Sequence, residues 1–309
     1  MIRPQTPSPV YLLNEPLFDE KGVQVYLKRD DQIHPYVQGN KWRKLKYNLL
    51  EARLQQQNTI LTFGGPYSNH IYATAAAARM FHFRSIGIIR GEEPTIKSPT
   101  LKFAASQGME LYYMDRVTYR HINEPYSIES LRVQLGDFYY VPEGGTNQYA
   151  IEGASEIVSE IDFAFDYITS PVGTSGTLAG IVAGLNGRNF AIGFSSLKGE
   201  DTLTTKVNAL LLEYTGRSFT NFSINFNYHF DGYAKISSGL VEFIHQFRAK
   251  HNIMLEPVYT GKMMYGLYDL IQTDYFKRGD VIVAVHTGGL QGLCGFENHF
   301  PGWSSSSFS

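Results

Sequence analysis

Cysteine is almost absent from this sequence of 309 residues, which contains a single one, Cys294. One thiol excludes a disulfide bond within the chain and argues against a zinc site built from thiolates. The nine histidines are scattered, with neither an H-x-x-x-H pair on a helix nor a nearby set of carboxylates, so we expect no metal site. The lack of cysteine fits a reducing compartment, and we expect a cytoplasmic protein.

Charge is also sparse, because charged residues make up 18% of the chain and the formal net charge is −2. No basic block is longer than one short helix start near residue 41, which argues against a nucleic-acid partner. No apolar run approaches the length of a transmembrane helix, and residues 1–4 lack the apolar core of a signal peptide. We therefore expect a soluble protein without a membrane partner.

The chain is longer than one hydrophobic core usually supports, so two lobes are expected. Short β-type runs alternate with helical patterns throughout, which is typical of an α/β fold with two open sheets. The unbroken apolar run at 280–285 predicts a central strand of a parallel sheet, buried on both faces. We expect residues 55–137 to form a smaller α/β domain, and residues 1–54 with 138–309 to form a larger one.

The pattern predicts strands at 23–28, 59–63, 85–90, 110–114, 167–172, 190–194 and 280–285. It predicts helices at 40–57, 69–81, 98–108, 127–135, 150–161, 178–185, 201–214, 236–250 and 263–273. Residues 1–22 are rich in proline and polar side chains, so we expect an arm or loops. Residues 218–230 alternate polar and aromatic side chains, which fits either a strand or a loop.

A turn rich in glycine and hydroxyl groups follows the strand expected at 167–172. It consists of Gly173, Thr174, Ser175, Gly176 and Thr177. At a helix N-terminus such a turn directs several backbone N–H groups and three hydroxyls toward one point, which can hold a phosphate. It lacks the Gly-Lys-Ser/Thr ending of a P-loop, and Thr177 breaks the G-x-S-x-G pattern of a hydrolase. A plain strand-to-helix turn is the alternative.

The segment Gly39–Tyr47 opens the helix expected at 40–57. Its first lysine, Lys41, lies at the mouth of that helix behind a glycine, where its amine can face a cleft. The alternative is a basic first turn with ordinary surface lysines. Lys44 and Lys46 lie about one turn further into the helix. We expect these two to serve the helix surface or a positive field on the phosphate side.

Further polar residues are expected at the carboxyl ends of strands, where open α/β sheets bind ligands. Ser68 and Asn69 follow a glycine turn and start a helix, for which Ser68 also suits the N-cap. Thr287 follows the most apolar strand and could be an ordinary turn residue or a hydroxyl that faces a ligand. Tyr233 and Tyr259 lie in loops flanked by glycine, although among 21 tyrosines a structural role is common.

Together these signals fit one cofactor. Pyridoxal phosphate requires an amine for a Schiff base, a cradle for its phosphate and a partner for its ring nitrogen. A lysine at a helix mouth and a turn rich in hydroxyls supply the first two of these groups. We therefore expect pyridoxal 5'-phosphate as the cofactor.

Over nearly its whole length, the chain resembles the fold-type-II pyridoxal-phosphate enzymes. Within them it resembles the group that contains 1-aminocyclopropane-1-carboxylate (ACC) deaminase and D-cysteine desulfhydrase. The matching motifs, in order, are Gly39–Leu45, Ser68-Asn69, the turn 173–177, the two loop tyrosines and His286–Gly289. The resemblance implies the tryptophan synthase β-like architecture, with two three-layer α/β/α lobes and the cofactor between them. It also implies a homodimer and a small amino acid as the substrate.

The resemblance also implies roles for individual residues. It makes Lys41 the lysine that forms the Schiff base. It makes Ser68 the residue that places the substrate or moves a proton, and Asn69 the residue that bonds the ring oxygen of the cofactor. The turn 173–177 would hold the phosphate, and Tyr233 and Tyr259 would be the catalytic tyrosines.

One departure from the family bears on the reaction. ACC deaminases typically follow the second tyrosine with a glutamate that pairs with the pyridine nitrogen, and this chain has Thr260 there. A hydroxyl, from Thr287 or Thr260, would leave that nitrogen largely neutral and the cofactor a weaker electron sink. Loss of a β-thiol tolerates a weaker sink than opening of a cyclopropane, because the departing group takes the electrons.

We therefore expect a D-cysteine desulfhydrase-like elimination that yields pyruvate, ammonia and sulfide. The alternative within the family is ACC deamination, which opens the ring to 2-oxobutyrate and ammonia. An alternative of another class is an inactive protein that binds an anion or pyridoxal phosphate without turnover.

Overall fold

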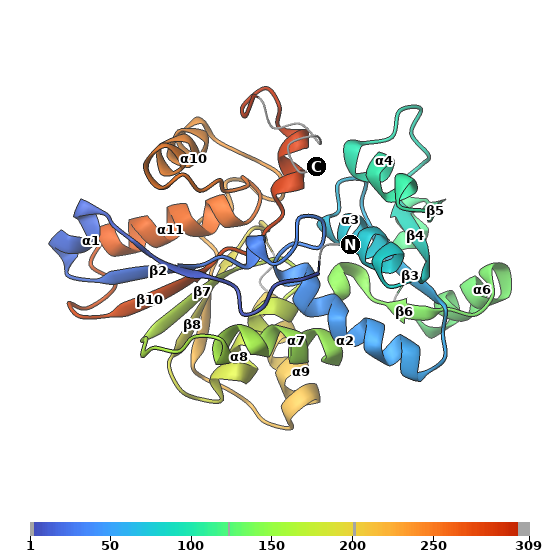
Figure 1. The fold of residues 1–309 in the computed structure, drawn as a ribbon, viewed down its shortest axis with the longest axis horizontal. Helices are drawn as coiled ribbons and strands as arrows, with labels where there is room; N and C mark the ends of the chain where they lie inside the picture. Colours follow the sequence, from blue (N-terminus) through green and yellow to red (C-terminus); the bar gives the residue numbers. More distant parts are fainter. Residues whose placement is uncertain (1–2, 123, 200–201, 302–309) are drawn as a thin grey trace.

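The structure is a computed structural model that describes residues 3–122, 124–199 and 202–301. Two open β-sheets divide it into two lobes, which confirms the expected α/β class (Figure 1). The larger sheet holds, in spatial order, β1 (Val10–Leu13), β2 (Gln24–Lys28), β10 (Val281–Val285), β7 (Tyr167–Val172), β8 (Phe190–Ser195) and β9 (Phe222–Asn225). The smaller sheet holds β5 (Met109–Met114), β4 (Arg84–Arg90), β3 (Thr59–Gly64) and β6 (Tyr139–Val141). Neighbouring strands are parallel except β1, which runs antiparallel to β2.

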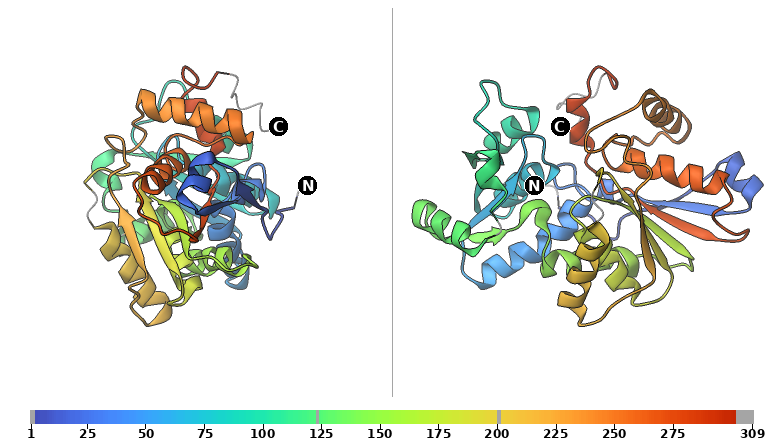
Figure 2. Two further views of the ribbon diagram at one scale, coloured as in Figure 1. Left: turned by 90° about the vertical axis from the view of Figure 1, so that its left-hand side faces the viewer. Right: turned by 180° about the vertical axis from the view of Figure 1, so that it is seen from behind.

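Helices cover both faces of each sheet. The larger lobe contains α1 (Pro16–Lys21), α7 (Gln148–Ser159), α8 (Gly176–Leu185), α9 (Leu203–Thr215), α10 (Ser238–His251) and α11 (Thr260–Gln272). The smaller lobe contains α3 (Asn69–Met80), α4 (Pro99–Ser106), α5 (Arg116–Tyr119) and α6 (Pro125–Leu135). Helix α2 (Asn40–Leu54) runs from one lobe to the other (Figure 2). Short 3₁₀ helices occur at Asp30–Gln32 (η1), Glu143–Gly145 (η2) and Leu290–Gly295 (η3).

Strand β10 shows why the apolar run at 280–285 is unbroken. Successive side chains of a strand point to opposite faces of the sheet. Ile282 and Ala284 lie in the core beneath α10 and α11, whereas Val283 and Val285 lie in the core beneath α7, α8 and α9 (Figure 1). The strand is therefore buried on both faces, as a parallel strand between two helix layers must be.

The expected strands and helices are present, with ends that differ by a few residues. Helix α2 stops at Leu54, earlier than expected, and Gln56 just after it adopts a left-handed backbone (φ 56°) that a helix cannot continue through. The segment 218–230 contains strand β9. The helix expected at 201–214 begins at Leu203, and Asp201 lies outside the described residues.

The expectation of an arm or loops at 1–22 was wrong in part, because this segment contains β1 and α1. Strand β1 escapes the alternation rule because it lies at a sheet edge, where Tyr11 and Leu12 are both exposed. Helix α1 has Pro16 in its first turn and ends at Gly22, which takes the left-handed conformation of a C-cap. The prolines and glycine of the segment thus mark helix ends.

The division into a smaller domain at 55–137 and a larger remainder stays a proposal. Strand β6 follows directly after the proposed boundary at 138, yet it pairs with β3 in the smaller sheet. We therefore move this boundary of the proposal past Val141. Within the described ranges, no helix is both long enough and apolar enough to cross a bilayer.

Helix α2 joins the lobes through two different contacts. Leu45, Leu49 and Ala52 pack in a core of the smaller lobe. On the side toward the larger lobe, the backbone of Arg43 lies against Gly153 of α7, where an added Cβ would be 1.9 Å from the Arg43 carbonyl oxygen. Only glycine lets the two helix backbones approach this closely.

Replacing Gly153 by alanine should therefore lower the free energy of unfolding by about 1–3 kcal/mol, because the helices must move apart. Urea unfolding followed by circular dichroism measures the change. The matched control is Gly239→Ala in α10, where the nearest atom to an added Cβ is 4.0 Å away. The free energy of unfolding of that variant should stay unchanged or rise by up to about 1 kcal/mol. Equal losses in both variants would contradict the proposed role of this contact.

Candidate functional site

A cleft of about 960 Å³ lies between the lobes, at the carboxyl ends of β3, β7 and β10. Its walls come from both lobes, as expected for a ligand site of an open α/β fold. The predicted site residues that line it are Lys41, Ser68, Asn69, Gly173, Thr174, Ser175, Thr177, Tyr233, Tyr259 and Thr287. Gly176 does not line the cleft; it lies behind the turn as the first residue of α8.

Lys41 occupies the first turn of α2, and two backbone contacts fix its place. Gly39 has a positive φ of 54°, and an added Cβ there would lie 2.0 Å from the carbonyl oxygen of Thr287. The backbone N–H of Asn40 donates to the same oxygen at 3.3 Å. The Lys41 amine makes no hydrogen bond with any described residue, and burial lowers its pKa to about 8. The lysine expected at a helix mouth therefore faces the cleft with a reactive amine.

Lys44 faces the same cleft, because residues three apart share one side of a helix. Its Nζ donates to the Gly144 carbonyl at 3.0 Å, to Thr146 Oγ1 at 3.2 Å and to Thr174 Oγ1 at 3.1 Å. Burial and the charge of Lys41 hold the pKa of Lys44 well below its usual range. The expected role of Lys44 on the helix surface is wrong, because the residue is buried. Its place beside the turn 173–177 fits the other expected role, a positive field on the phosphate side. The i,i+3 spacing from Lys41 was the signal for it in the sequence.

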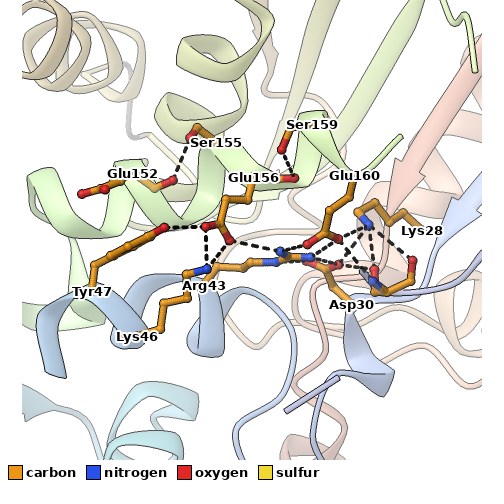
Figure 3. A network of polar contacts seen from close by, with 11 residues as sticks. Lys28, Asp30, Arg43, Lys46, Tyr47, Glu152, Ser155, Glu156, Ser159 and Glu160 are labelled. Atoms are coloured by element: carbon orange, nitrogen blue, oxygen red, sulfur yellow. Dashed lines mark hydrogen bonds and ion pairs between the residues drawn. The ribbon is translucent and has the colours of Figure 1, made fainter. Parts of the chain in front are cut away.

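The opposite side of α2 is held by buried charges (Figure 3). The Arg43 guanidinium pairs with Asp30 of η1 at 3.0 Å and with Glu160, which follows α7. Lys28 donates to Glu160 at 2.7 Å, while Lys46 pairs with Glu156 of α7. Burial alone would raise the pKa of Glu160, but its bonds from Arg43 and Lys28 lower it to about 2. Three cations and three anions thus neutralise one another beside the helix that carries Lys41.

The turn 173–177 has the form of an anion cradle. Ser175 adopts a left-handed conformation (φ 67°) just before α8, and its buried hydroxyl has no partner among the described residues. Thr177 Oγ1 accepts from the Asn40 side chain at 2.9 Å, which ties the turn to the lysine motif. The N–H groups at the start of α8 and the free Ser175 hydroxyl fit a phosphate.

Ser68 caps α3 and still has a hydrogen to give. Its Oγ accepts from the backbone N–H groups of His70 and Ile71 at 3.2 and 3.3 Å. The hydroxyl hydrogen is not used in these bonds, so it remains available to a group in the cleft. The N-cap role and the catalytic role proposed for Ser68 are therefore compatible.

His70 also lines the cleft, and its protonation follows from its neighbours. Thr62 donates its only hydroxyl hydrogen to the Val141 carbonyl at 2.8 Å, so its bond to His70 Nε2 at 2.9 Å must come from the ring N–H. His70 Nδ1 then carries a lone pair, and it has no partner among the described residues. Burial and the charges of Lys41 and Lys44 keep the pKa of His70 well below its usual value, so the ring is neutral.

The two loop tyrosines meet at the edge of the cleft. The rings of Tyr233 and Tyr259 are 6.1 Å apart and edge to face. Burial raises the pKa of Tyr259 well above its usual value, so its hydroxyl stays protonated. Lys262 donates to the carbonyls of His229 and Gly232 at 2.8 Å each and so holds the loop that carries Tyr233. This anchoring role of Lys262 was missed in the sequence, although the motif contains the residue.

The structure separates the two threonines that were candidates for the ring nitrogen. Thr287 lines the cleft. Thr260 is fully buried and is absent from the cleft wall. Its hydroxyl accepts from the Glu256 backbone N–H at 3.0 Å and donates to the Glu256 carboxylate at 3.2 Å. That carboxylate also accepts from the backbone N–H groups of Val258 and Tyr259, at 2.8 Å each, and of Thr260, the first residue of α11, at 2.5 Å, so it is used in holding the start of this helix.

The fold and the cleft define a class of protein. They combine a two-lobed α/β framework with a lysine of lowered pKa and an anion cradle at the start of a helix. These are the groups that a phosphorylated aldehyde cofactor requires. Within the described ranges, no cluster of three or more histidine, cysteine or acidic side chains is placed to hold a metal ion.

The chain belongs to the pyridoxal-phosphate dependent enzyme family, whose family model matches residues 3–288. A relative from Thermotoga maritima, named provisionally as an ACC deaminase, is 31% identical over 302 residues, which cover 93% of this chain and 95% of the relative. The mitochondrial bifunctional D-cysteine desulfhydrase/ACC deaminase of Arabidopsis thaliana is 31% identical over 316 residues, which cover 93% of this chain and 77% of that protein.

Solved structures agree with this assignment. A crystal structure of an ACC deaminase homologue matches with a TM-score of 0.84 and 28% identity, and the match covers 96% of this chain and 94% of that one. A threonine deaminase from Solanum lycopersicum shares the fold, with a TM-score of 0.65 and 18% identity. The expectations of a fold-type-II enzyme and of pyridoxal phosphate as its cofactor are confirmed.

The lowered pKa of Lys41 predicts its reactivity in the cofactor-free protein. Acylation of Lys41 by an amine-reactive reagent should reach half its maximal rate near pH 8, because the uncharged amine reacts. N-acetyl-lysine, with an ordinary pKa of about 10.4, is the control. Mass spectrometry of the labelled peptide measures the rate at each pH. A half-maximal rate for Lys41 near that of the control would contradict the buried environment described here.

Proposed function

We propose that this chain catalyses α,β-elimination of D-cysteine, in which one water and the amino acid give pyruvate, ammonia and hydrogen sulfide. The name of the Arabidopsis relative, which includes D-cysteine desulfhydrase, supports the substrate. The observation that carries the choice of reaction is the hydroxyl of Thr287 in the cleft, at a site without a carboxylate from α11.

The carboxylates near the cleft are otherwise engaged. Glu256 accepts hydrogen bonds from the backbone N–H groups of residues 258–260, which lead into α11, and it does not line the cleft. Glu143 is the one acidic residue among the described lining residues, and it accepts from the Tyr119 hydroxyl at 3.0 Å. A hydroxyl partner such as Thr287 would leave the ring nitrogen largely neutral. Elimination of a thiol remains feasible with a neutral ring, because the sulfur leaves with the electrons.

The residues that would hold the cofactor are Lys41, Asn69, Thr287 and the turn 173–177. The free Ser175 hydroxyl and the unpaired Lys41 amine are the observations that support this fit. When bound, pyridoxal phosphate supplies an electron sink for the electron pair left at the α-carbon of the amino acid.

The remaining chemistry falls to side chains of this chain. Lys41 has a pKa of about 8, so a useful fraction of its amine is uncharged near neutral pH and can take the α-proton. Ser68 can place the substrate through its free hydroxyl hydrogen. Burial raises the pKa of both Tyr259 and Tyr233, so both hydroxyls stay protonated, and either tyrosine can donate to the departing sulfur.

ACC deamination is the second candidate, because four relatives from Thermotoga and Pyrococcus are named provisionally for it. The ACC deaminase homologue with a TM-score of 0.84 also supports it. We further propose a cytoplasmic homodimer. Its support is the resemblance to the family and the single cysteine of the chain.

A panel of D- and L-amino acids together with ACC tests the reaction. Purified enzyme should release pyruvate and sulfide from D-cysteine, measured by a coupled keto-acid assay and by sulfide trapping. Release of 2-oxobutyrate from ACC, without pyruvate from D-cysteine, would reverse the choice. A yellow protein that borohydride bleaches, but that releases no keto acid from any substrate, would indicate the inactive binding protein.

The variant Lys41→Ala should lower keto-acid release by at least about 10²–10⁴-fold, because general acid–base help of that size is lost. It should also lose the visible absorbance of the lysine-bound cofactor. Lys102→Ala, on the exposed side of α4, is the matched control and should keep both properties. Normal turnover by Lys41→Ala would refute the assignment of this lysine.

A further inference from the structure

One glutamine of the larger lobe bonds a predicted cofactor ligand of the smaller lobe. Gln291 lies in η3, which follows β10 of the larger lobe, and Asn69 begins α3 of the smaller lobe. The Nε2 of Gln291 donates to the Oδ1 of Asn69 at 2.8 Å. Gln291 is 8% exposed, and its Oε1 has no partner among the described residues. The bond therefore joins two amides at the point where the lobes meet.

The segment that carries Gln291 is firmly held. The side-chain oxygen of Gln38 accepts from the backbone N–H groups of Gly289 and Leu290, both at 3.1 Å. Gln38 itself is buried just before α2. The position of Gln291 is thus fixed relative to the helix that carries Lys41.

The other side of the Asn69 amide is shaped by Gly289. This glycine has a positive φ of 92°, and an added Cβ would lie 2.6 Å from Asn69 Nδ2. A side chain at 289 would therefore displace the NH₂ group of Asn69. Gly289 thus leaves room for the NH₂ group of Asn69 when the oxygen of Asn69 accepts from Gln291.

Two amides that meet in this way can pair in two orientations. Either Gln291 donates to the oxygen of Asn69, or Asn69 donates to the oxygen of Gln291. In the first orientation both hydrogens of the Asn69 NH₂ group remain available. In the second, one hydrogen is consumed and the Asn69 oxygen turns toward the former place of the NH₂ group. An anionic ring oxygen of a ligand accepts hydrogen bonds, so only the first orientation suits it.

We propose that Gln291 is a positioning residue that fixes the Asn69 amide so that its NH₂ group serves the ring oxygen of the cofactor. The proposal rests on the cofactor-binding role assigned to Asn69 under the proposed function. Gln291 acts through Asn69 and does not itself touch the cofactor. Because the two residues belong to different lobes, the same bond aligns Asn69 with the turn that carries Thr287.

The variant Gln291→Glu tests this orientation with almost no change of shape. A carboxylate can only accept hydrogen bonds, so it forces Asn69 to donate and to turn its oxygen toward the cofactor. The dissociation constant for pyridoxal phosphate, measured by absorbance titration, should rise by at least about 10-fold. The pH dependence of the visible band of the bound cofactor should change with it.

Two comparisons separate orientation from packing. Gln291→Met keeps the length of the side chain but favours neither orientation, so its loss of affinity should be clearly smaller than that of Gln291→Glu. Lower pH protonates the introduced carboxyl, which can then donate again. The affinity of Gln291→Glu relative to the native protein should therefore recover as the pH falls. A purely structural role predicts no such recovery. Thermal unfolding of each cofactor-free variant checks that it is folded.

The variant Asn69→Ala completes a double-mutant cycle, because it removes the NH₂ group without adding a second negative charge beside position 291. In that variant, adding Gln291→Glu should raise the dissociation constant for pyridoxal phosphate by a much smaller factor than it does in the native protein. Equal losses in Gln291→Glu and Gln291→Met at every pH, or no loss in either, would overturn the proposal. These titrations need no turnover, so the binding result stands even if D-cysteine releases no keto acid. A native protein that fails to bind pyridoxal phosphate would overturn both this proposal and the proposed function.

Discussion

The burial of Arg43 between Asp30 and Glu160 is the constraint on which the site depends (Figure 3). A buried charge without partners costs several kcal/mol, so η1, α2 and the end of α7 must come together for the chain to fold. Residues 41 and 43 point about 200° apart around a helix. A clamp on the Arg43 side therefore turns Lys41 toward the cleft. The close approach of Gly39 to the Thr287 carbonyl fixes the same helix from its first turn.

Much of this arrangement could be predicted because the signals are local. The apolar run of β10 predicts a strand buried on both faces, and its packing under two helix layers needs no further information. The motifs around Lys41, Ser68, the turn 173–177 and Thr287 each lie at the start of a helix or the end of a strand. In open α/β sheets the carboxyl ends of parallel strands share one edge. Four positions that are far apart in the sequence could therefore be expected in one cleft.

What the sequence could not show depends on contacts between distant segments. Asn69 and Gln291 are 222 positions apart, and nothing in either local pattern indicates that their amides meet. That Thr287 lines the cleft and Thr260 does not was equally hidden, because it depends on the bonds between Thr260 and Glu256. Strand β1 was missed for a related reason. Its two exposed central residues carry no alternation, and its pairing with β2 becomes evident only in the assembled sheet.

The two lysines of the cleft share a lowered pKa but differ in their hydrogen-bond partners. Burial lowers the pKa of both Lys41 and Lys44, and His70 beside them is neutral. Lys44 has three oxygen acceptors for the three hydrogens of an ammonium, and it lies at the turn where a phosphate would bring negative charge. An anion there would favour its charged form. Lys41 has no such partners among the described residues, and burial lowers its pKa to about 8, so part of its amine is uncharged near neutral pH, as the proposed role as a base requires. The two lysines thus differ in their partners: three oxygens hold Lys44, whereas no described residue bonds the Lys41 amine.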